Sequence, residues 1–282
     1  MIYNTPFSEG MMLYKKSETD KWNSLIELYK NNYLNGEYSE KLRIPKIIHQ
    51  IWLGSPFPQE YEKISETWKK FHPDWEYHLW TDDNINSLEL KNQEAFNKTS
   101  NLGAKSDILR CEILYQLGGL YIDTDFECLK AFDDIHYRCD FYAGVLPSFE
   151  PCIMNSLMGS APNNAIIREI INRISSTSNN GNPDEVFNAT GPWHLTRCFF
   201  DVVKATAQKC IIFPSTFFYP SPNYNSGVNE DIQKEYIKEE SHAIHYWHIS
   251  WTKNKKSLIY IIKKIIKHIL PYGLVKSLYK LK

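Results

Sequence analysis

Residues Gly103 to Glu127 read GAKSDILRCEILYQLGGLYIDTDFE. Apolar side chains recur on a broad face between residues 104 and 117, which predicts a mostly buried helix. Gly118 and Gly119 follow and are expected to end that helix. The apolar run over 120–122 then indicates a short buried strand. A helix, a tight turn and a buried strand in series are typical of an α/β protein.

Two carboxylates, Asp123 and Asp125, come directly after that strand. In an extended segment, side chains two residues apart project to the same face, so these two are expected to face each other across Thr124. Neighbouring anions repel, and a divalent cation that prefers oxygen ligands keeps both of them ionised. The pattern therefore predicts a Mg²⁺ or Mn²⁺ site. An isolated D-x-D is also common on solvated loops, so the assignment depends on the surrounding motifs.

The predicted helix carries Asp107 and Arg110, three residues apart and therefore on one face. This spacing is compatible with an ordinary intrahelical ion pair, which contributes roughly 0.2–0.5 kcal/mol. It is also compatible with an Arg that faces an anionic substrate, because open α/β sheets bind their ligands at the carboxyl ends of the strands.

The rest of the chain continues the alternation of strands and helices. Apolar runs predict strands over 46–52 and 75–80, and a helical pattern between them predicts a helix over 59–71. Stretches rich in Pro, Asn and Ser predict long loops over 175–183 and 214–227. The architecture expected from this alternation is α/β.

The chain has 282 residues, of which 43% are hydrophobic and 14% aromatic, so it can bury a sizeable core and is not disordered. Its formal net charge of −1 gives no indication of nucleic-acid binding. Six cysteines without a C-x-x-C spacing predict free thiols. We find no secretory signal or membrane anchor at the N-terminus, so a cytosolic protein is expected.

Four motifs together resemble a known family. SDILR at 106–110, then twelve residues, then DTD resembles the sugar-transferase region with a D-x-D motif. That region is shared by glycosyltransferase family 32, which includes yeast initiating mannosyltransferases, and by the glucosylating domains of the large clostridial toxins. The other similar segments are IPKIIHQIWLG at 44–54, TGPWHLT at 190–196 and AIHYWHISW at 243–251.

The resemblance implies a GT-A nucleotide-diphospho-sugar transferase fold, with a Rossmann-like mixed sheet flanked by helices. It implies a metal-dependent, retaining glycosyltransferase that uses Mn²⁺ or Mg²⁺. The donor implied is a nucleotide-sugar, with UDP favoured. The acceptor expected is a surface polysaccharide or a lipid-linked oligosaccharide, as in capsule or lipopolysaccharide synthesis.

The resemblance also carries roles to individual positions. It implies that Asp107, Arg110 and Asp125 act in catalysis, and that Asp123, Asp125 and His245 hold the metal. The donor contacts implied are Trp52, Asp107, Arg110, Asp123, Asn155, Gly191, Ser250 and Trp251. Two alternatives remain: Trp52 could be a core residue instead of a stacking platform for the base, and Asn155 could be a turn residue.

Three histidines, His242, His245 and His248, are spaced three apart, as two turns of a zinc-binding helix would require. The aromatic and β-branched residues between them indicate a strand instead, and a strand does not bring such positions to one face. We therefore do not assign zinc to them.

We expect three parts in the chain: an N-terminal helical addition over 1–43 with an amphipathic helix at 20–34, a catalytic domain over 44–252 and a tail over 253–282. Apolar residues in the tail recur at helical spacing opposite a set of lysines, which predicts a basic amphipathic helix up to Pro271. Such a helix either packs on the catalytic domain or docks on an anionic membrane. We expect docking, and hence a peripheral enzyme on the inner face of the cell membrane.

Two other classes of protein are considered. A phosphohydrolase of the haloacid-dehalogenase type also ends a strand in D-x-D, but it requires Thr or Val where this chain has Glu127. A catalytically inactive sugar-binding protein would retain the aromatic residues and lose the metal carboxylates, and both carboxylates are present here.

Overall fold

The structure is a computed structural model that describes residues 6–8, 16–146, 150–174 and 183–248. The predicted tail over 253–282, the contacts assigned to Ser250 and Trp251, and most of the loop predicted over 175–183 lie outside the described residues.

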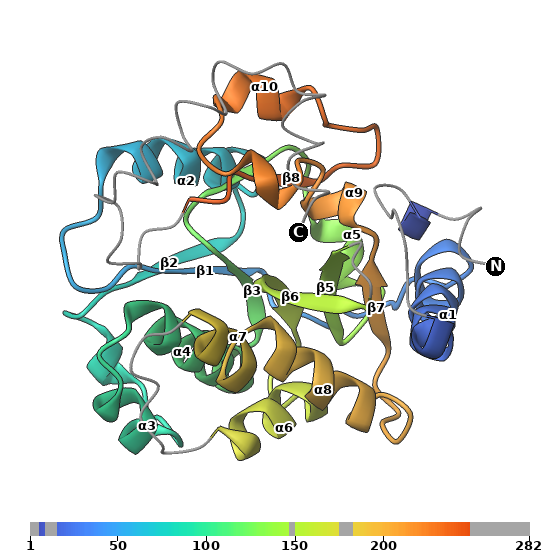
Figure 1. The fold of residues 1–282 in the computed structure, drawn as a ribbon, viewed down its shortest axis with the longest axis horizontal. Helices are drawn as coiled ribbons and strands as arrows, with labels where there is room; N and C mark the ends of the chain where they lie inside the picture. The colour runs from blue at the N-terminus through green and yellow to red at the C-terminus, as the bar shows by residue number, and fades with distance from the viewer. Residues whose placement is uncertain (1–5, 9–15, 147–149, 175–182, 249–282) are drawn as a thin grey trace.

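A six-stranded sheet forms the centre of the molecule, in the order β2-β1-β3-β6-β5-β7 (Figure 1). β6 runs antiparallel to both of its neighbours, and the other strand pairs are parallel. A second sheet pairs β4 with β8 in antiparallel fashion. The strands are β1 Ile47–Ile51, β2 Glu76–Trp80, β3 Gly119–Ile122, β4 Phe126–Cys128, β5 Phe141–Leu146, β6 Cys152–Ser160, β7 Cys210–Phe213 and β8 Ala243–His245.

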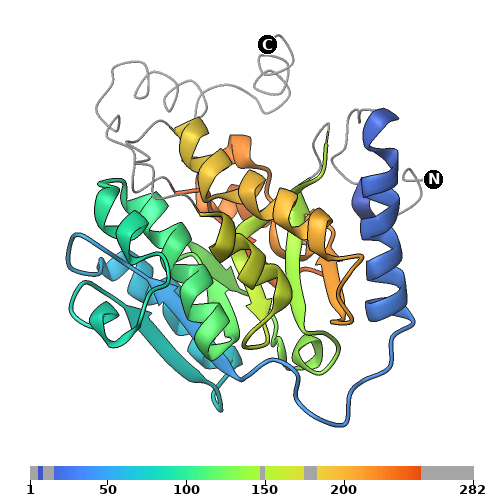
Figure 2. The ribbon, with the colours of Figure 1, turned by 90° about the horizontal axis from the view of Figure 1, so that it is seen from below.

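Helices cover both sides of the central sheet (Figures 1 and 2). The α-helices are α1 Thr19–Tyr29, α2 Gln59–Phe71, α3 Gln93–Lys98, α4 Leu102–Leu117, α5 Asp133–His136, α6 Ala165–Arg173, α7 Pro183–Ala189, α8 Pro192–Val202, α9 Ser215–Phe218 and α10 Glu230–Lys234. α4, α6 and α8 pack together on one side, and α2 packs against β4 on the other. No helix in the described ranges is long and apolar enough to cross a membrane.

The predicted elements agree closely with this architecture. The helix predicted over 59–71 is α2, the strands predicted over 46–52 and 75–80 are β1 and β2, and the helix predicted over 104–117 is α4. All six cysteines are buried free thiols, as expected. The expected α/β fold class is confirmed.

The loop predicted over 214–227 is wrong in part. α9 forms within it, and Phe217 and Phe218 of this short helix are buried against β5 and β7. Pro214 and Ser215 stand at the start of that helix, where their turn-forming composition resembles that of a loop. Apolar burial then outweighs the turn-forming composition.

The predicted N-terminal helix is present as α1 and a terminal π-helical turn at Lys30–Leu34. Its apolar face is buried, with Trp22, Leu25 and Tyr29 part of the same core as the sheet. α1 lies beside β7, the edge strand, and in the turn after α1 the side-chain Nδ2 of Asn32 donates to the carbonyl of Cys210 at 2.8 Å. The helix therefore covers an edge that would otherwise expose unpaired backbone groups. The division of the chain near residue 43 stays a prediction.

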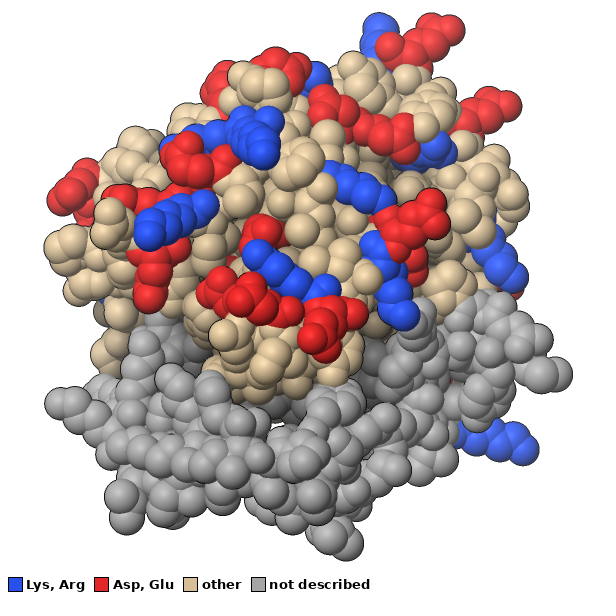
Figure 3. Space-filling view, turned by 90° about the horizontal axis from the view of Figure 1, so that it is seen from above, with Lys and Arg blue, Asp and Glu red and all other residues tan. Residues whose placement is uncertain are grey.

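One face of the molecule, over α2 and α10, carries basic and acidic side chains in alternation (Figure 3). This face does not have the broad basic surface that is typical of nucleic-acid-binding proteins. It agrees with the near-neutral charge of the chain.

Two buried histidines link the sheet to its surroundings. His49 on β1 contacts the carbonyl of Gly118 at 2.9 Å, and His136 contacts the carbonyl of Ile44 and the hydroxyl of Tyr142. Burial lowers the pKa of His49 to about 4 and that of His136 to about 3. Both imidazoles are therefore neutral in the folded protein at neutral and mildly acidic pH.

We expect the protein to lose stability as the pH falls below about 6.5. In the unfolded chain both imidazoles take up a proton near pH 6.5, whereas in the folded state they resist until about pH 4 and 3, so the unfolded state binds more protons between these values. Each should remove about 1.5 kcal/mol from the free energy of unfolding between pH 6.5 and pH 5. Urea titrations across this range measure the loss. A free energy of unfolding independent of pH, or imidazole NMR signals from both residues that titrate near 6.5, would contradict the assignment.

Candidate active site

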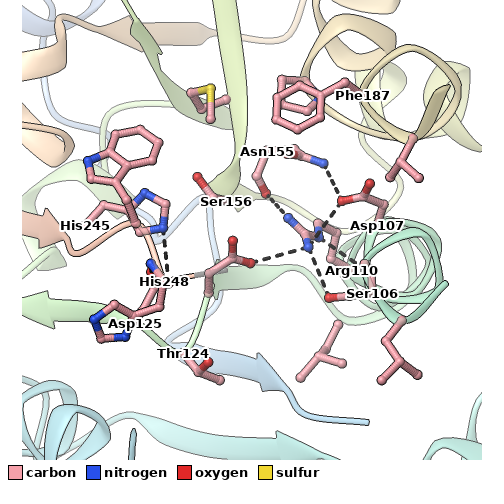
Figure 4. A pocket seen from close by; sticks show the side chains of 18 of the residues that line it. Ser106, Asp107, Arg110, Thr124, Asp125, Asn155, Ser156, Phe187, His245 and His248 are labelled. Carbon is pink, nitrogen blue, oxygen red and sulfur yellow. Dashed lines mark hydrogen bonds and ion pairs between the residues drawn. The ribbon is translucent and has the colours of Figure 1, made fainter. Parts of the chain in front are cut away.

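A cavity of about 660 Å³ opens at the carboxyl ends of β1 and β3 and is lined by most of the predicted site residues (Figure 4). The predicted residues that line it are Trp52, Asp107, Arg110, Asp123, Asp125, Asn155 and His245. They come from α4, β6 and β8 and from the segments that directly follow β1 and β3, so the fold assembles the site from segments far apart in the sequence.

The two carboxylates of the D-x-D lie in a turn and not in an extended segment. β3 ends at Ile122, and the amide of Phe126 donates back to the carbonyl of Asp123 at 3.3 Å. The prediction that strand alternation makes the two side chains face each other is therefore wrong. Their proximity comes from the turn, which the amide of Asp123 anchors to the carbonyl of Ser156 on β6 at 2.8 Å.

His245 reaches the carboxylates through the second sheet. In the ladder of β4 with β8, Phe126 pairs with His245, which places the imidazole beside Asp125. Nε2 of His245 lies 3.1 Å from Oδ1 of Asp125, and the backbone amide of His248 donates to Oδ2 of the same carboxylate at 2.7 Å. The three side chains predicted to hold a metal are thus brought together, with one ligand atom from each within 4.8 Å of the others.

The two carboxylates and the imidazole fit a divalent cation such as Mn²⁺ or Mg²⁺. Carboxylates are preferred by Mg²⁺ and Mn²⁺, and imidazole is a common ligand of transition metals. In addition, Nδ1 of His245 is buried and finds no hydrogen-bond partner among the described residues. A buried polar atom without a partner is costly, which is compatible with a ligand at this place.

The carboxyl groups of the cluster differ in the direction in which their pKa is shifted. Burial opposes the ionisation of Asp125, but His245 and the amide of His248 outweigh it and hold the pKa of this carboxyl below its usual value. Burial raises the pKa of Asp107 and of Asp123 against the opposing charge of Arg110, and Asp125 adds to the effect on Asp123. Asp125 is therefore the most firmly ionised of the three carboxylates.

Arg110 lies at the centre of the polar wall. Its guanidinium is 3.2 Å from Asp107 and 3.3 Å from Asp123, and it donates to the carbonyl of Asn155 at 2.9 Å. Its plane covers the ring of Tyr121, 4.5 Å from the ring centroid. Asp107 and Arg110 do form the intrahelical pair that their spacing allows, but the pair is buried and lines the cavity instead of facing bulk solvent.

Asn155 is not a turn residue. It lies within β6, is buried, and donates from Nδ2 to Oδ1 of Asp107 at 2.8 Å. Its side chain therefore holds Asp107 while its carbonyl holds Arg110.

Trp52 is not a buried core residue either. Its indole is half-buried on the cavity wall, packs against Tyr61 and Phe57, and donates from Nε1 to Ser55. One side of the ring is thus supported by other aromatic residues, as a stacking platform requires.

Gly191 is buried at the start of α8, behind the cavity, and is not among the described residues that line it. A side chain here would meet the backbone of Phe187 at 3.0 Å, so the glycine allows the close approach of α7 and α8. The neighbouring Pro192 and Trp193 do line the cavity.

Two residues inside the motifs were not assigned a role from the sequence. Trp247 lines the cavity, and its ring centroid lies 4.2 Å from that of His245, which stacks on Phe126 from another side. Thr190 donates to Asp107 at 3.0 Å. In the sequence, Trp247 belongs to the motif AIHYWHISW and Thr190 to the motif TGPWHLT. The motifs do not show which of their residues contact the site.

Comparisons with known proteins agree with this geometry. Residues 58–142 match the family model described as "Glycosyltransferase sugar-binding region containing DXD motif". Inositol phosphoceramide mannosyltransferase 1 of Schizosaccharomyces pombe is 27% identical over 194 residues, which cover 65% of this chain and 60% of that protein. Mannosyl phosphorylinositol ceramide synthase CSH1 of Saccharomyces cerevisiae is 28% identical over 142 residues, which cover 49% and 37%. The matches thus span at most 60% of the length of these relatives.

The fold is similar to that of toxin glycosyltransferases. PaToxG glycosyltransferase aligns with a TM-score of 0.51 at 19% identity, over 67% of this chain and 79% of that one. The catalytic domain of alpha-toxin from Clostridium novyi aligns with a TM-score of 0.50 at 11% identity, over 94% and 91%. The chain is thus similar in sequence to yeast mannosyltransferases over part of its length, its residues 58–142 match the DXD-containing sugar-binding region of glycosyltransferases, and its fold is the GT-A fold of the toxin domains.

Proposed function

We propose that the protein is a metal-dependent, retaining glycosyltransferase that moves a hexose from a nucleotide-sugar to a glycan or glycolipid acceptor. The observation that carries this proposal is the convergence of Asp123, Asp125 and His245 beside Arg110 in one cavity. Retention of configuration is proposed from the family resemblance, and NMR of the anomeric proton in the product tests it: a donor of α configuration should give an α product.

Each residue in the cavity has a proposed task. Asp123, Asp125 and His245 would hold Mn²⁺ or Mg²⁺, which when bound would neutralise the charge of the diphosphate. Arg110 contributes a second positive charge that is fixed before the reaction, so it stabilises negative charge on the departing nucleoside diphosphate without reorganisation. Trp52 would stack on the base, and Asp107 would accept hydrogen bonds from hydroxyl groups of the donor.

The donor and acceptor are proposed in broad terms. We favour a UDP-sugar on the resemblance to the toxin domains. The relatives named as mannosyltransferases make mannose a second candidate for the transferred sugar, so a donor panel should include GDP-mannose. The Schizosaccharomyces relative is named for inositol phosphoceramide and the Saccharomyces relative for phosphorylinositol ceramide, which supports a lipid-linked or glycolipid acceptor. A surface polysaccharide remains the other candidate.

The two rival classes are not favoured. A phosphohydrolase of the haloacid-dehalogenase type would use the first Asp of the motif as a nucleophile, whereas Asp123 here accepts a hydrogen bond from Tyr121 at 2.6 Å and pairs with Arg110. An inactive sugar-binding protein would not require three metal-ligating side chains around one point.

We expect Asp125→Asn to abolish both sugar transfer and slow donor hydrolysis, because the metal loses its most firmly ionised ligand. Thermal unfolding should show that the variant still folds. Nucleotide-sugar turnover with and without added Mn²⁺ measures the effect, and treatment with a chelator should mimic it in the wild type. Asp201→Asn is the matched control. Asp201 is an exposed residue of α8 that pairs with Arg173 of α6, and it is not among the described residues that line the cavity. Normal Mn²⁺-stimulated turnover in Asp125→Asn would exclude the proposed metal site.

We expect Trp52→Ala to weaken UDP binding by about 1–3 kcal/mol, because a stacked base loses its platform. Titration calorimetry with UDP and Mn²⁺ measures this. Phe57→Ala is the control: Phe57 packs against Trp52 but is not among the described residues that line the cavity, so its loss should affect UDP binding less. Unchanged UDP affinity in Trp52→Ala together with a large drop in melting temperature would show that Trp52 serves only packing.

The tail is proposed to dock the enzyme on the inner face of the cell membrane. From Tyr246 to the last residue the chain contains nine lysines and no acidic residue, and each lysine near an anionic surface gains about 1 kcal/mol. Removing residues from Asn254 onward should abolish sedimentation with phosphatidylglycerol vesicles and leave donor hydrolysis in solution unchanged. Equal vesicle binding by the shortened and full-length proteins would rule the proposal out.

A further inference from the structure

The carboxylate of Asp107 is buried in the cavity wall and is held by three donors. Oδ1 accepts from Nδ2 of Asn155 at 2.8 Å and pairs with Arg110 at 3.2 Å. Oδ2 accepts from the hydroxyl of Thr190 at 3.0 Å. The donors belong to β6, to α4 and to the junction of α7 with α8, so three separate segments fix one carboxylate.

A carboxylate offers about four acceptor positions, and these contacts use three of them. The remaining capacity is on Oδ2, where Thr190 is the one protein donor that we find among the described residues. Since Asp107 lines the cavity, this oxygen is suited to accept a hydrogen bond from a hydroxyl group of a bound ligand. The direction of that hydrogen bond depends on the hydrogen bond that Thr190 donates to the same oxygen.

Thr190 itself is rigidly placed. It is buried, and its backbone amide and that of Gly191 both donate to the carbonyl of Val186, at 3.0 and 2.9 Å. Its hydroxyl lies 3.3 Å from the same carbonyl, but the charged carboxylate is nearer and is the stronger acceptor. The close approach that Gly191 permits keeps this junction compact.

The junction also belongs to the cavity wall. Val186 and Phe187 of α7, and Pro192 and Trp193 of α8, line the cavity on either side of Thr190. Figure 4 shows Phe187 on the same side of the cavity as Asp107 and Asn155. The hydroxyl of Thr190 therefore connects a largely apolar wall to the polar group that faces the ligand.

We propose that Thr190 is a positioning residue for recognition of the donor sugar. Its hydroxyl orients Oδ2 of Asp107 toward a sugar hydroxyl, and the same hydrogen bond fixes the distance between the α7–α8 wall and Asp107. The inference rests on the proposed function, because it requires a nucleotide-sugar in this cavity. It assigns the sugar end of the donor, and not the nucleotide end, to the Thr190–Asp107 pair.

The test compares Thr190→Val, which keeps the shape and removes the hydroxyl, with Thr190→Ser, which keeps the hydroxyl. Calorimetry with Mn²⁺ gives the affinity for UDP-glucose and for UDP, and for GDP-mannose and GDP. Thr190→Val should weaken binding of the sugar nucleotide that the wild type binds by about tenfold or more and leave the affinity for its nucleoside diphosphate unchanged, because Oδ2 of Asp107 loses the donor that orients it and Asp107 faces the sugar end only. Thr190→Ser should recover most of the affinity.

Thr196→Val is the matched control. Thr196 lies on α8, which begins two residues after Thr190. Its hydroxyl donates to the carbonyl of Pro192 at 2.7 Å and accepts from the amide of Ile153 at 2.9 Å, and we find no contact from it to Asp107 in the described ranges. Thr196→Val should lower the melting temperature and preserve the preference for the sugar nucleotide over the nucleoside diphosphate.

Equal weakening of the sugar nucleotide and the nucleoside diphosphate in Thr190→Val would overturn the inference. So would the same selective loss in Thr196→Val, or a Thr190→Ser variant as weak as Thr190→Val. A wild type that binds no member of a panel of UDP- and GDP-sugars would instead overturn the proposed function, and this inference with it.

Discussion

The antiparallel pairing of β4 with β8 is the constraint on which the site depends. It joins Phe126 to His245 and so places an imidazole beside a carboxylate 120 positions away in the sequence. α2 fixes β4 in turn, because Trp68 donates to the carbonyl of Phe126 at 2.6 Å and Thr67 accepts from the amide of Cys128 at 3.0 Å. An error in this small sheet would separate the ligands even if the central sheet were intact.

The charges of the cavity follow from the same arrangement. Three carboxylates, of Asp107, Asp123 and Asp125, lie near one another in a wall that excludes much of the solvent. Arg110 compensates the first two and His245 and the amide of His248 stabilise the third, so the cluster can exist before a cation is bound. A divalent cation would therefore enter a site whose anions are already oriented, which lowers the cost of binding it.

Local patterns in the sequence were sufficient for the elements, and the resemblance to glycosyltransferases pointed to seven residues that the structure places around one cavity. The boundaries of α2 followed from its periodicity, and the ends of β1 and β3 followed from apolar runs next to Gly and Asp. The turn geometry of the D-x-D could not be predicted in this way, since it depends on a contact of Asp123 with Ser156 on a strand that comes later in the chain. Thr190 and Trp247 were missed for the same reason: their roles are contacts with Asp107 and His245, and no local pattern encodes those contacts.

Trp247 shows how such a non-local contact can be maintained against a local cost. Its φ of 59° lies in the left-handed region, which costs a bulky residue on the order of 1–3 kcal/mol. Two hydrogen bonds from the preceding loop offset this cost: Nε1 donates to the carbonyl of Ser221 at 2.8 Å, and the carbonyl of Trp247 accepts from the hydroxyl of Ser226 at 2.6 Å. The reversal of the chain at this residue allows the next amide, that of His248, to donate back to Asp125 while the indole still covers His245. An extended backbone at Trp247 would carry that amide away from the carboxylate, so the strained conformation is a requirement of the hydrogen bonding around Asp125 and not a defect of the fold.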